Sequence, residues 1–122
     1  MLTVPFTNVS TLKFGHAQAI IERIEKVAEE WDLDTTKLLT LNLSNRILAE
    51  AMFTWKPKYR SGFGVVFCDI TLSGKAYKNS SFEWVMKCLN HELAHWVCVA
   101  HELDLGHGKD FKEICDALGG TY

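Results

Sequence analysis

Two histidines and a glutamate in the second half of the chain have the spacing of a metal-dependent hydrolase. They lie in the segment HELAH, which runs from His91 to His95. Residues four apart on an α-helix differ by about 40° around its axis, so His91 and His95 would present both imidazoles on one face. Glu92 lies about 100° from His91 and would reach a water bound to the metal. The segment therefore predicts two zinc ligands with a general base beside them, which is hydrolytic chemistry.

A third ligand has to come from elsewhere, because hydrolytic zinc sites commonly have three protein ligands and one open position. His107 is the strongest candidate. The Leu105-Gly106 step before it gives the chain a place to turn back, and Gly108 after it permits close approach of the backbone to a metal. A returning histidine would then complete a three-histidine site.

Two other residues remain as weaker alternatives for the third ligand. His101 follows His95 by six residues, but Cys98 stands where a glycine would have to break the helix. On a continuous helix His101 would lie about 100° from the midline of the other two imidazoles. Glu113 has a suitable separation, yet it is expected on the exposed face of a final helix.

The metal-binding segment is expected in the second half of a helix that runs from about residue 82 to about residue 102. The pattern S-x-x-E at Ser80 to Glu83 is typical of a capping box at its start. A shorter helix follows from Lys109 to about Leu118, with Gly119-Gly120 as its C-cap. The apolar positions of the longer helix recur every four residues, at Val85, Leu89, Leu93 and Val97.

Upstream, the pattern indicates one amphipathic helix and a small sheet. The helix begins at His16 and runs to about Trp31, after an extended lead-in over residues 1–14. Residues 73–79 are expected to form a polar loop. The expected strands are 39–43, 51–58 and 64–72, of which the last two form a hairpin through residues 59–63. The fold class is therefore α+β, with a small antiparallel sheet of about three strands.

Composition is that of one small globular domain. The 122 residues are 48% hydrophobic and 23% charged, with a net charge of −2, which excludes disordered and fibrous classes. The N-terminus lacks the pattern of a signal peptide and no apolar run is long enough to span a membrane. We expect a monomer that does not bind membranes, is not secreted and is cytoplasmic or nucleoid-associated. The four cysteines include no CxxC pair, so we expect buried reduced thiols rather than a zinc ribbon.

Positive charge gathers beside one aromatic residue in the expected hairpin. Lys56, Lys58 and Arg60 follow Trp55 within five residues. The chain as a whole lacks the broad basic character of a dedicated nucleic-acid binder. These four residues are the candidate contacts to a substrate or to nucleic acid.

Set beside HELAH, the segment His107-Gly108-Lys109-Asp110-Phe111 resembles a motif of the SprT-like (Spartan-type) zinc metallopeptidases. In that family the HExxH helix is followed, after a variable loop, by HGxxF/W. The resemblance extends to Leu43-Ser44-Asn45-Arg46 and covers about residues 15–118 of a single domain, 1–122. It implies a zincin-like minimal metallopeptidase domain. Some members add a C-terminal zinc ribbon, which we do not expect in this chain. It also implies one Zn²⁺ per chain held by His91, His95 and His107, with Glu92 as the catalytic base.

The function that this resemblance implies is that of a zinc-dependent endopeptidase acting on protein substrates in extended conformation. Some members digest proteins crosslinked to DNA, so DNA-associated proteins are an expected substrate class and DNA an expected partner. Two alternatives stay open. One is a zinc-stabilised module that binds protein or DNA without catalysis, and the other is a metal-dependent endoribonuclease whose third histidine is His101.

Overall fold

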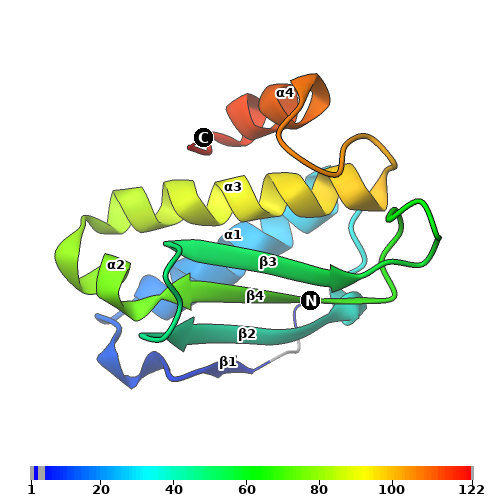
Figure 1. The fold of residues 1–122 in the computed structure, drawn as a ribbon. Helices are drawn as coiled ribbons and strands as arrows, with labels where there is room; N and C mark the ends of the chain where they lie inside the picture. Colours follow the sequence, from blue (N-terminus) through cyan, green and yellow to red (C-terminus); the bar gives the residue numbers. More distant parts are fainter. Residues whose placement is uncertain (1, 3–4, 122) are drawn as a thin grey trace.

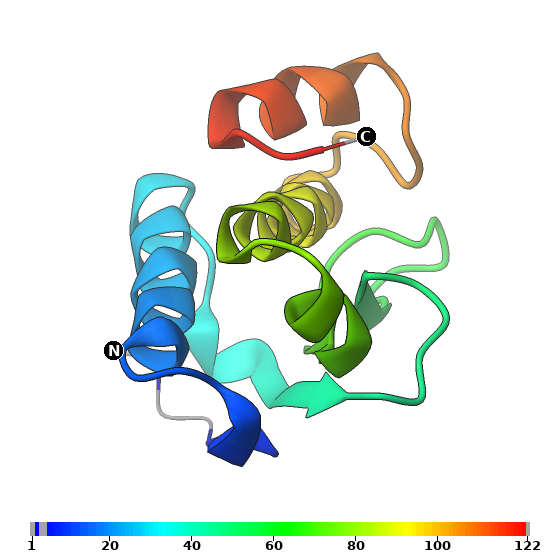
Figure 2. The ribbon, with the colours of Figure 1, turned by 90° about the vertical axis from the view of Figure 1, so that its left-hand side faces the viewer.

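One face of a four-stranded mixed sheet is covered by two long helices, and a third helix packs on the far side of one of them. The computed structural model describes residues 2 and 5–121. Figure 2 shows α3 between the sheet and α4, with α1 beside it on the same face of the sheet. The elements are β1 (Phe6–Thr7), α1 (His16–Glu30), β2 (Leu38–Ser44), β3 (Ala51–Lys56), β4 (Phe67–Ser73), α2 (Gly74–Asn79), α3 (Phe82–Ala100) and α4 (Lys109–Leu118), with 3-10 turns at Val9–Thr11 and Thr35–Lys37 (Figure 1).

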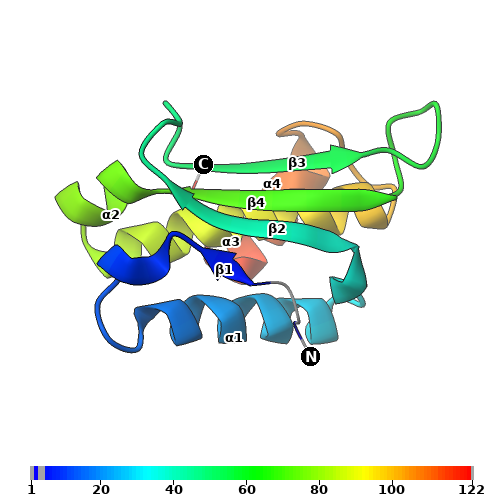
Figure 3. The same cartoon turned by 90° about the horizontal axis from the view of Figure 1, so that it is seen from below.

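The expected antiparallel sheet of about three strands is wrong in strand number and in orientation. The strand order is β1-β2-β4-β3, in which β4 pairs parallel with β2 and antiparallel with β3, and β1 pairs parallel with β2 (Figure 3). Alternation of apolar residues identifies a strand but not its partner, so the insertion of β4 between β2 and β3 was invisible in the sequence. The hairpin of β3 and β4 is confirmed.

Three short elements were also missed. The expected extended lead-in contains β1, which is two residues long, and the turn Val9–Thr11. The expected polar loop after β4 forms the single-turn helix α2, because Ser73 Oγ accepts a hydrogen bond from the backbone N–H of Ala76 at 3.0 Å. Elements this short carry no measurable periodicity. The three long helices, in contrast, begin where the sequence predicts.

The core lies between the sheet and the helices α1 and α3. On α1 the buried residues fall on one stripe, as the amphipathic pattern predicts. Strand residues alternate, so that β3 buries Ala51 and Phe53 and exposes Met52 and Thr54. All four cysteines are buried free thiols, as expected. In the part of the chain described here, no helix is long and apolar enough to cross a membrane.

The helix that carries the metal-binding segment is capped one residue later than the sequence predicts. Ser81, rather than Ser80, is the N-cap of α3, and its hydroxyl accepts a hydrogen bond from the backbone N–H of Trp84 at 3.1 Å. Ser80 instead ends α2. Glu83 therefore lies in the first turn but not at the third helical position that a capping box requires.

Replacing Ser81 by alanine leaves the N–H of Trp84 without its acceptor. We expect Ser81→Ala to lower the free energy of unfolding by about 1 kcal/mol, as other N-cap substitutions do. Ser80→Ala should change it by less than half as much. Urea unfolding of both variants measures the difference, and equal losses would show that Ser80 takes part in the cap.

Candidate metal centre

Three imidazoles from two separate segments converge on one point beside α3. His91 and His95 lie on successive turns of α3, and His107 lies in the loop between α3 and α4. The Nε2 atom of His107 is 3.1 Å from Nε2 of His95 and 3.3 Å from Nε2 of His91. One ligand atom from each residue lies within 4.8 Å of the others, so the cluster could hold a metal ion.

The two distances from Nε2 of His107 are close to those between the ligands of a tetrahedral metal. Ligands at 2.0–2.1 Å from a metal, as imidazoles are from zinc, lie about 3.3–3.4 Å apart at tetrahedral angles. Two neutral imidazoles whose Nε2 lone pairs face each other at this distance repel unless a proton or a cation lies between them. Three imidazole donors suit several transition metals, zinc among them.

Burial keeps two of the three histidines in the form that binds metal. Burial, reinforced by the imidazoles of His91 and His107, lowers the pKa of His95 to about 4. Burial also lowers the pKa of His91 below its ordinary range. Both rings are therefore neutral at pH 7, and a neutral imidazole is the form with a free lone pair.

The C-terminal segment selects the tautomer of His91. Nδ1 of His91 lies within hydrogen-bonding distance of the carbonyl oxygen of Thr121. A carbonyl only accepts, so Nδ1 carries the proton and Nε2 carries the lone pair that faces the cluster. A Cβ on Gly120 would lie 2.5 Å from Cys115 Sγ and 3.0 Å from the backbone nitrogen of His91, so a glycine is required for this close approach. This contact could not be predicted from the sequence, because every residue type carries a backbone carbonyl.

A hydrogen-bonded network secures that segment against α3. The guanidinium of Arg23 on α1 donates to Asn90 Oδ1 and to the carbonyl of Leu118, each at 2.8 Å. Asn90, the residue before His91, donates from Nδ2 to the carbonyl of Gly119 at 3.4 Å. The network therefore joins α1, α3 and the end of α4 immediately behind the first metal ligand.

Glu92 is a buried carboxylate beside the three histidines. It is 9% exposed, and its Oε2 lies 3.8 Å from Nε2 of His91. Burial raises its pKa to about 7, an effect that a hydrogen bond from the backbone N–H of Phe53 on β3 partly offsets. A carboxyl group with this pKa can both accept and return a proton near neutral pH.

The conformation of the loop that carries His107 is stabilised by the carboxylate of Asp104 and does not depend on a turn at Gly106. Glu102 takes the left-handed conformation (φ 58°) and Leu103 N–H bonds to the carbonyl of Cys98 at 2.8 Å, which ends α3 before Gly106 is reached. Asp104 then accepts from Gly106 N–H at 2.9 Å. Its pKa is lowered by hydrogen bonds from four backbone N–H groups, those of Gly106, Phe111, Gly108 and Leu105.

Gly108 has a different role from the one expected. A Cβ at this position would lie 2.6 Å from Oδ2 of Asp104, so the missing side chain makes room for the carboxylate and not for a metal. Phe111 forms the apolar wall behind the imidazoles. Its ring is fully buried, stacks on His95 with centroids 4.3 Å apart and meets His91 and His107 edge-on.

His101 and Glu113, the alternative third ligands, lie outside the cluster. Nε2 of His101 is 2.6 Å from the carbonyl oxygen of Trp31, so this imidazole joins the C-terminal end of α3 to that of α1. Glu113 lies on the exposed side of α4. The expectation that His101 would point away from the other two histidines is confirmed, and its pairing with Trp31 required the tertiary structure.

The four candidate contact residues lie on and after β3. Trp55 is half-buried, donates from Nε1 to the carbonyl of Gly62 at 3.0 Å and stacks on Phe53, so it stabilises the hairpin. Lys56 and Lys58 are exposed, with their ammonium groups over the rings of Phe67 and Tyr59. Arg60 is exposed in the connection to β4. None of them contacts the three histidines.

A family model described as the SprT-like family matches residues 18–122. The chain belongs to the SprT-like family. Comparisons with curated proteins and with solved structures gave no significant match. The assignment confirms the resemblance carried by HELAH and HGKDF, and together with the histidine cluster it makes this SprT-like chain a metallopeptidase-like domain.

Histidine substitutions separate the two candidates for the third ligand. We expect His107→Ala to lose bound metal after dialysis, because only two imidazoles remain, whereas His101→Ala should keep one metal ion per chain. Elemental analysis after loading with zinc measures both. The assignment is wrong if His101→Ala loses the metal while His107→Ala keeps it.

Removing the carboxylate of Asp104 should release the loop that positions His107. We expect Asp104→Ala to weaken metal affinity about 10- to 100-fold, the usual effect of losing a group that orients a ligand. Competition with a chromophoric chelator measures the affinity. Asp116→Ala removes an exposed carboxylate of α4 as the control, and an equal effect in both variants would indicate a general electrostatic cause.

Proposed function

We propose that this SprT-like domain is a zinc-dependent endopeptidase in which Glu92 is the general base. The observation that carries the proposal is the convergence of three imidazole Nε2 atoms beside the buried Glu92 carboxylate. His91, His95 and His107 would hold the ion, one per chain, beside the carboxylate of Glu92. Three protein ligands are typical of a hydrolytic zinc site, in which water is the fourth.

Each residue of the site has a separate role in the proposed hydrolysis of a peptide bond. When bound, zinc supplies Lewis acidity, which lowers the pKa of water at the site and polarises a peptide carbonyl. Glu92 accepts the proton of the attacking water on its carboxylate and passes it to the nitrogen of the leaving amine. Phe53 N–H donates a hydrogen bond that holds the carboxylate in place, and the buried ring of Phe111 packs against the imidazoles.

The substrate would lie extended along β3. Among the described residues this strand pairs with β4 alone, so its other edge has backbone groups available to a peptide, apart from the Phe53 N–H that contacts Glu92. Figure 1 shows β3 as the strand nearest to α3, and Phe53 on β3 touches Glu92. Recognition through the backbone favours unfolded or extended protein substrates over any one sequence.

Proteins bound to DNA are the substrate class that the family resemblance suggests. Support comes from Lys56, Lys58 and Arg60, which are exposed at the end of β3 and in the connection that follows it. Phosphate groups of a nearby DNA strand could pair with them. Tyr77 is not free to donate a hydrogen bond to the developing oxyanion, because its hydroxyl is hydrogen-bonded to Nδ1 of His16 and to the backbone N–H of Lys13.

Glu92→Gln tests the proposed chemistry. The amide keeps the size and one acceptor oxygen of the carboxylate but takes up no proton, so we expect full zinc content and a loss of about 10²- to 10⁴-fold in kcat/KM. Zinc stoichiometry and cleavage of casein and histone, each with and without double-stranded DNA, measure the outcome. Glu113→Gln on α4 is the matched control.

The same assay distinguishes the rival function. Retained turnover in Glu92→Gln would refute the role of Glu92. One zinc per chain without cleavage of any unfolded protein by the wild type would instead favour a zinc-stabilised binding module. Stimulation of cleavage by DNA would support DNA-bound substrates.

A further inference from the structure

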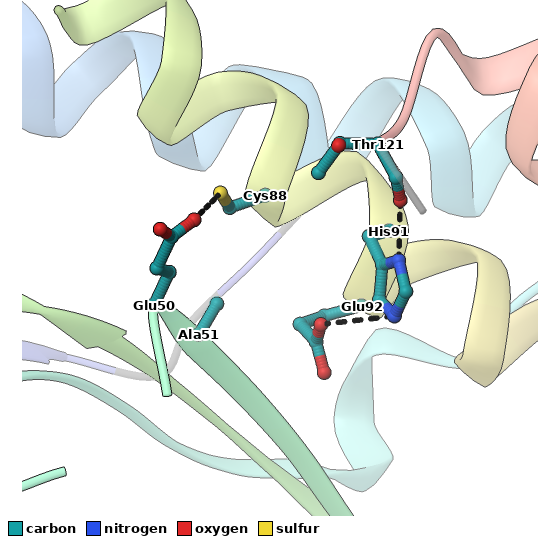
Figure 4. A pocket seen from close by; sticks show the side chains of 6 residues that line it. All are labelled: Glu50, Ala51, Cys88, His91, Glu92 and Thr121. Atoms are coloured by element: carbon teal, nitrogen blue, oxygen red, sulfur yellow. Dashed lines mark hydrogen bonds and ion pairs between the residues drawn. The ribbon is translucent and has the colours of Figure 1, made fainter. Parts of the chain in front are cut away.

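A small cavity opens directly beside the metal ligand His91 and the base Glu92. Its volume is about 190 Å³, and its walls are Glu50, Ala51, Cys88, His91, Glu92 and Thr121 (Figure 4). Pockets that enclose whole small molecules are larger, about 300–1,000 Å³. The cavity therefore has room for one side chain of a larger substrate.

The carboxylate of Glu50 stands at the end of the cavity away from Glu92 (Figure 4). Two neutral donors hold it there: Trp84 Nε1–H at 2.7 Å and Cys88 Sγ–H at 3.1 Å, both to Oε2. The hydrogen bond from Ser73 N–H to the carbonyl of Glu50, at 3.0 Å, fixes its backbone. Among the described residues no cation is paired with this carboxylate. The carboxylate is exposed to solvent, and these three hydrogen bonds hold it at a fixed position in the wall of the cavity.

The dimensions of the cavity match a long basic side chain. Cys88, which touches Glu50, lies one turn before Glu92 on α3, and four helical residues rise about 6 Å. A lysine or arginine stem covers that length, and Ala51 and Cys88 supply apolar surface along it. At the end of the cavity away from the metal ligands the charged group is Glu50, and no lysine or arginine lines the cavity. The negative charge at this end favours a cation over a neutral or acidic group.

The cavity lies between the start of β3, along which the substrate would bind, and the proposed reacting centre. Glu50 immediately precedes β3, the edge strand along which the peptide would lie, and His91 and Glu92 mark the reacting centre. A side chain entering the cavity therefore belongs to a residue that directly flanks the scissile bond. We propose that this cavity is the subsite for that residue, that it takes lysine or arginine, and that Glu50 determines this specificity.

The inference rests on the proposed peptidase function, so its test has one arm that needs cleavage and one that does not. In the first arm, the zinc-loaded wild type, Glu50→Gln and Glu50→Lys digest a denatured protein mixture, and mass spectrometry maps the cleaved bonds. Glutamine keeps an acceptor for Trp84 and Cys88 and removes only the charge. Glu29→Gln, which removes an exposed charge from α1, is the control.

In the first arm we expect lysine and arginine to be enriched at one position flanking the cleaved bonds, in the wild type and in Glu29→Gln. Glu50→Gln should reduce kcat/KM for a lysine peptide, relative to its norleucine analogue, about two- to fivefold, as loss of a solvent-exposed ion pair would. Glu50→Lys should shift the preference toward aspartate and glutamate. Cleavage with the same preference in all four proteins would overturn the inference while leaving the peptidase function intact.

In the second arm, the lysine peptide and its norleucine analogue are titrated into zinc-loaded Glu92→Gln, with and without Glu50→Gln. Tighter binding of the lysine peptide that disappears with Glu50→Gln supports the subsite even if the wild type cleaves nothing. Equal binding of the two peptides refutes it. Absence of cleavage together with Glu50-dependent binding would mean that the proposed function fails and the subsite stands.

Discussion

The structure depends on holding three imidazoles with their Nε2 atoms turned toward one point. Facing lone pairs repel each other unless a cation lies between them, so contacts from residues outside the cluster must hold the rings in place. Two contacts do so. The carbonyl of Thr121 fixes the tautomer of His91, and the carboxylate of Asp104 gathers the loop that brings His107 back to α3. Both come from backbone and loop geometry, and the packing of Phe111 against all three rings keeps them in register.

Burial of Glu92 is the second costly feature, and β3 offsets part of that cost. A buried carboxylate without a partner is strongly destabilising, whereas here the backbone N–H of Phe53 donates to it. The remaining desolvation raises its pKa toward neutrality, which is the range that a general base needs. Strand β3 thus contributes residues to the core and also lowers the pKa of Glu92, the proposed general base, through the N–H of Phe53.

Both proposals depend on the edge strand β3. β3 contributes the N–H that contacts Glu92, presents the unpaired edge proposed for the substrate and begins directly after Glu50 at the far end of the cavity. Its position at the edge follows from the insertion of β4 between β2 and β3. A simple antiparallel meander of the three expected strands would have placed β3 in the centre and left it no free edge.

The sequence by itself determined the long helices, the two histidines of α3 with Glu92 between them, and the choice of His107 in the HGKDF segment, because helical periodicity and short motifs are local. Only the tertiary structure decided the sheet order, the pairing of His101 with Trp31, the roles of Asp104 and Thr121 and the cavity at Glu50. Each of these joins segments distant in the chain, or uses a backbone group that every residue type carries. The physical reason is that side-chain patterns record which face of an element is buried, but not which partner covers it.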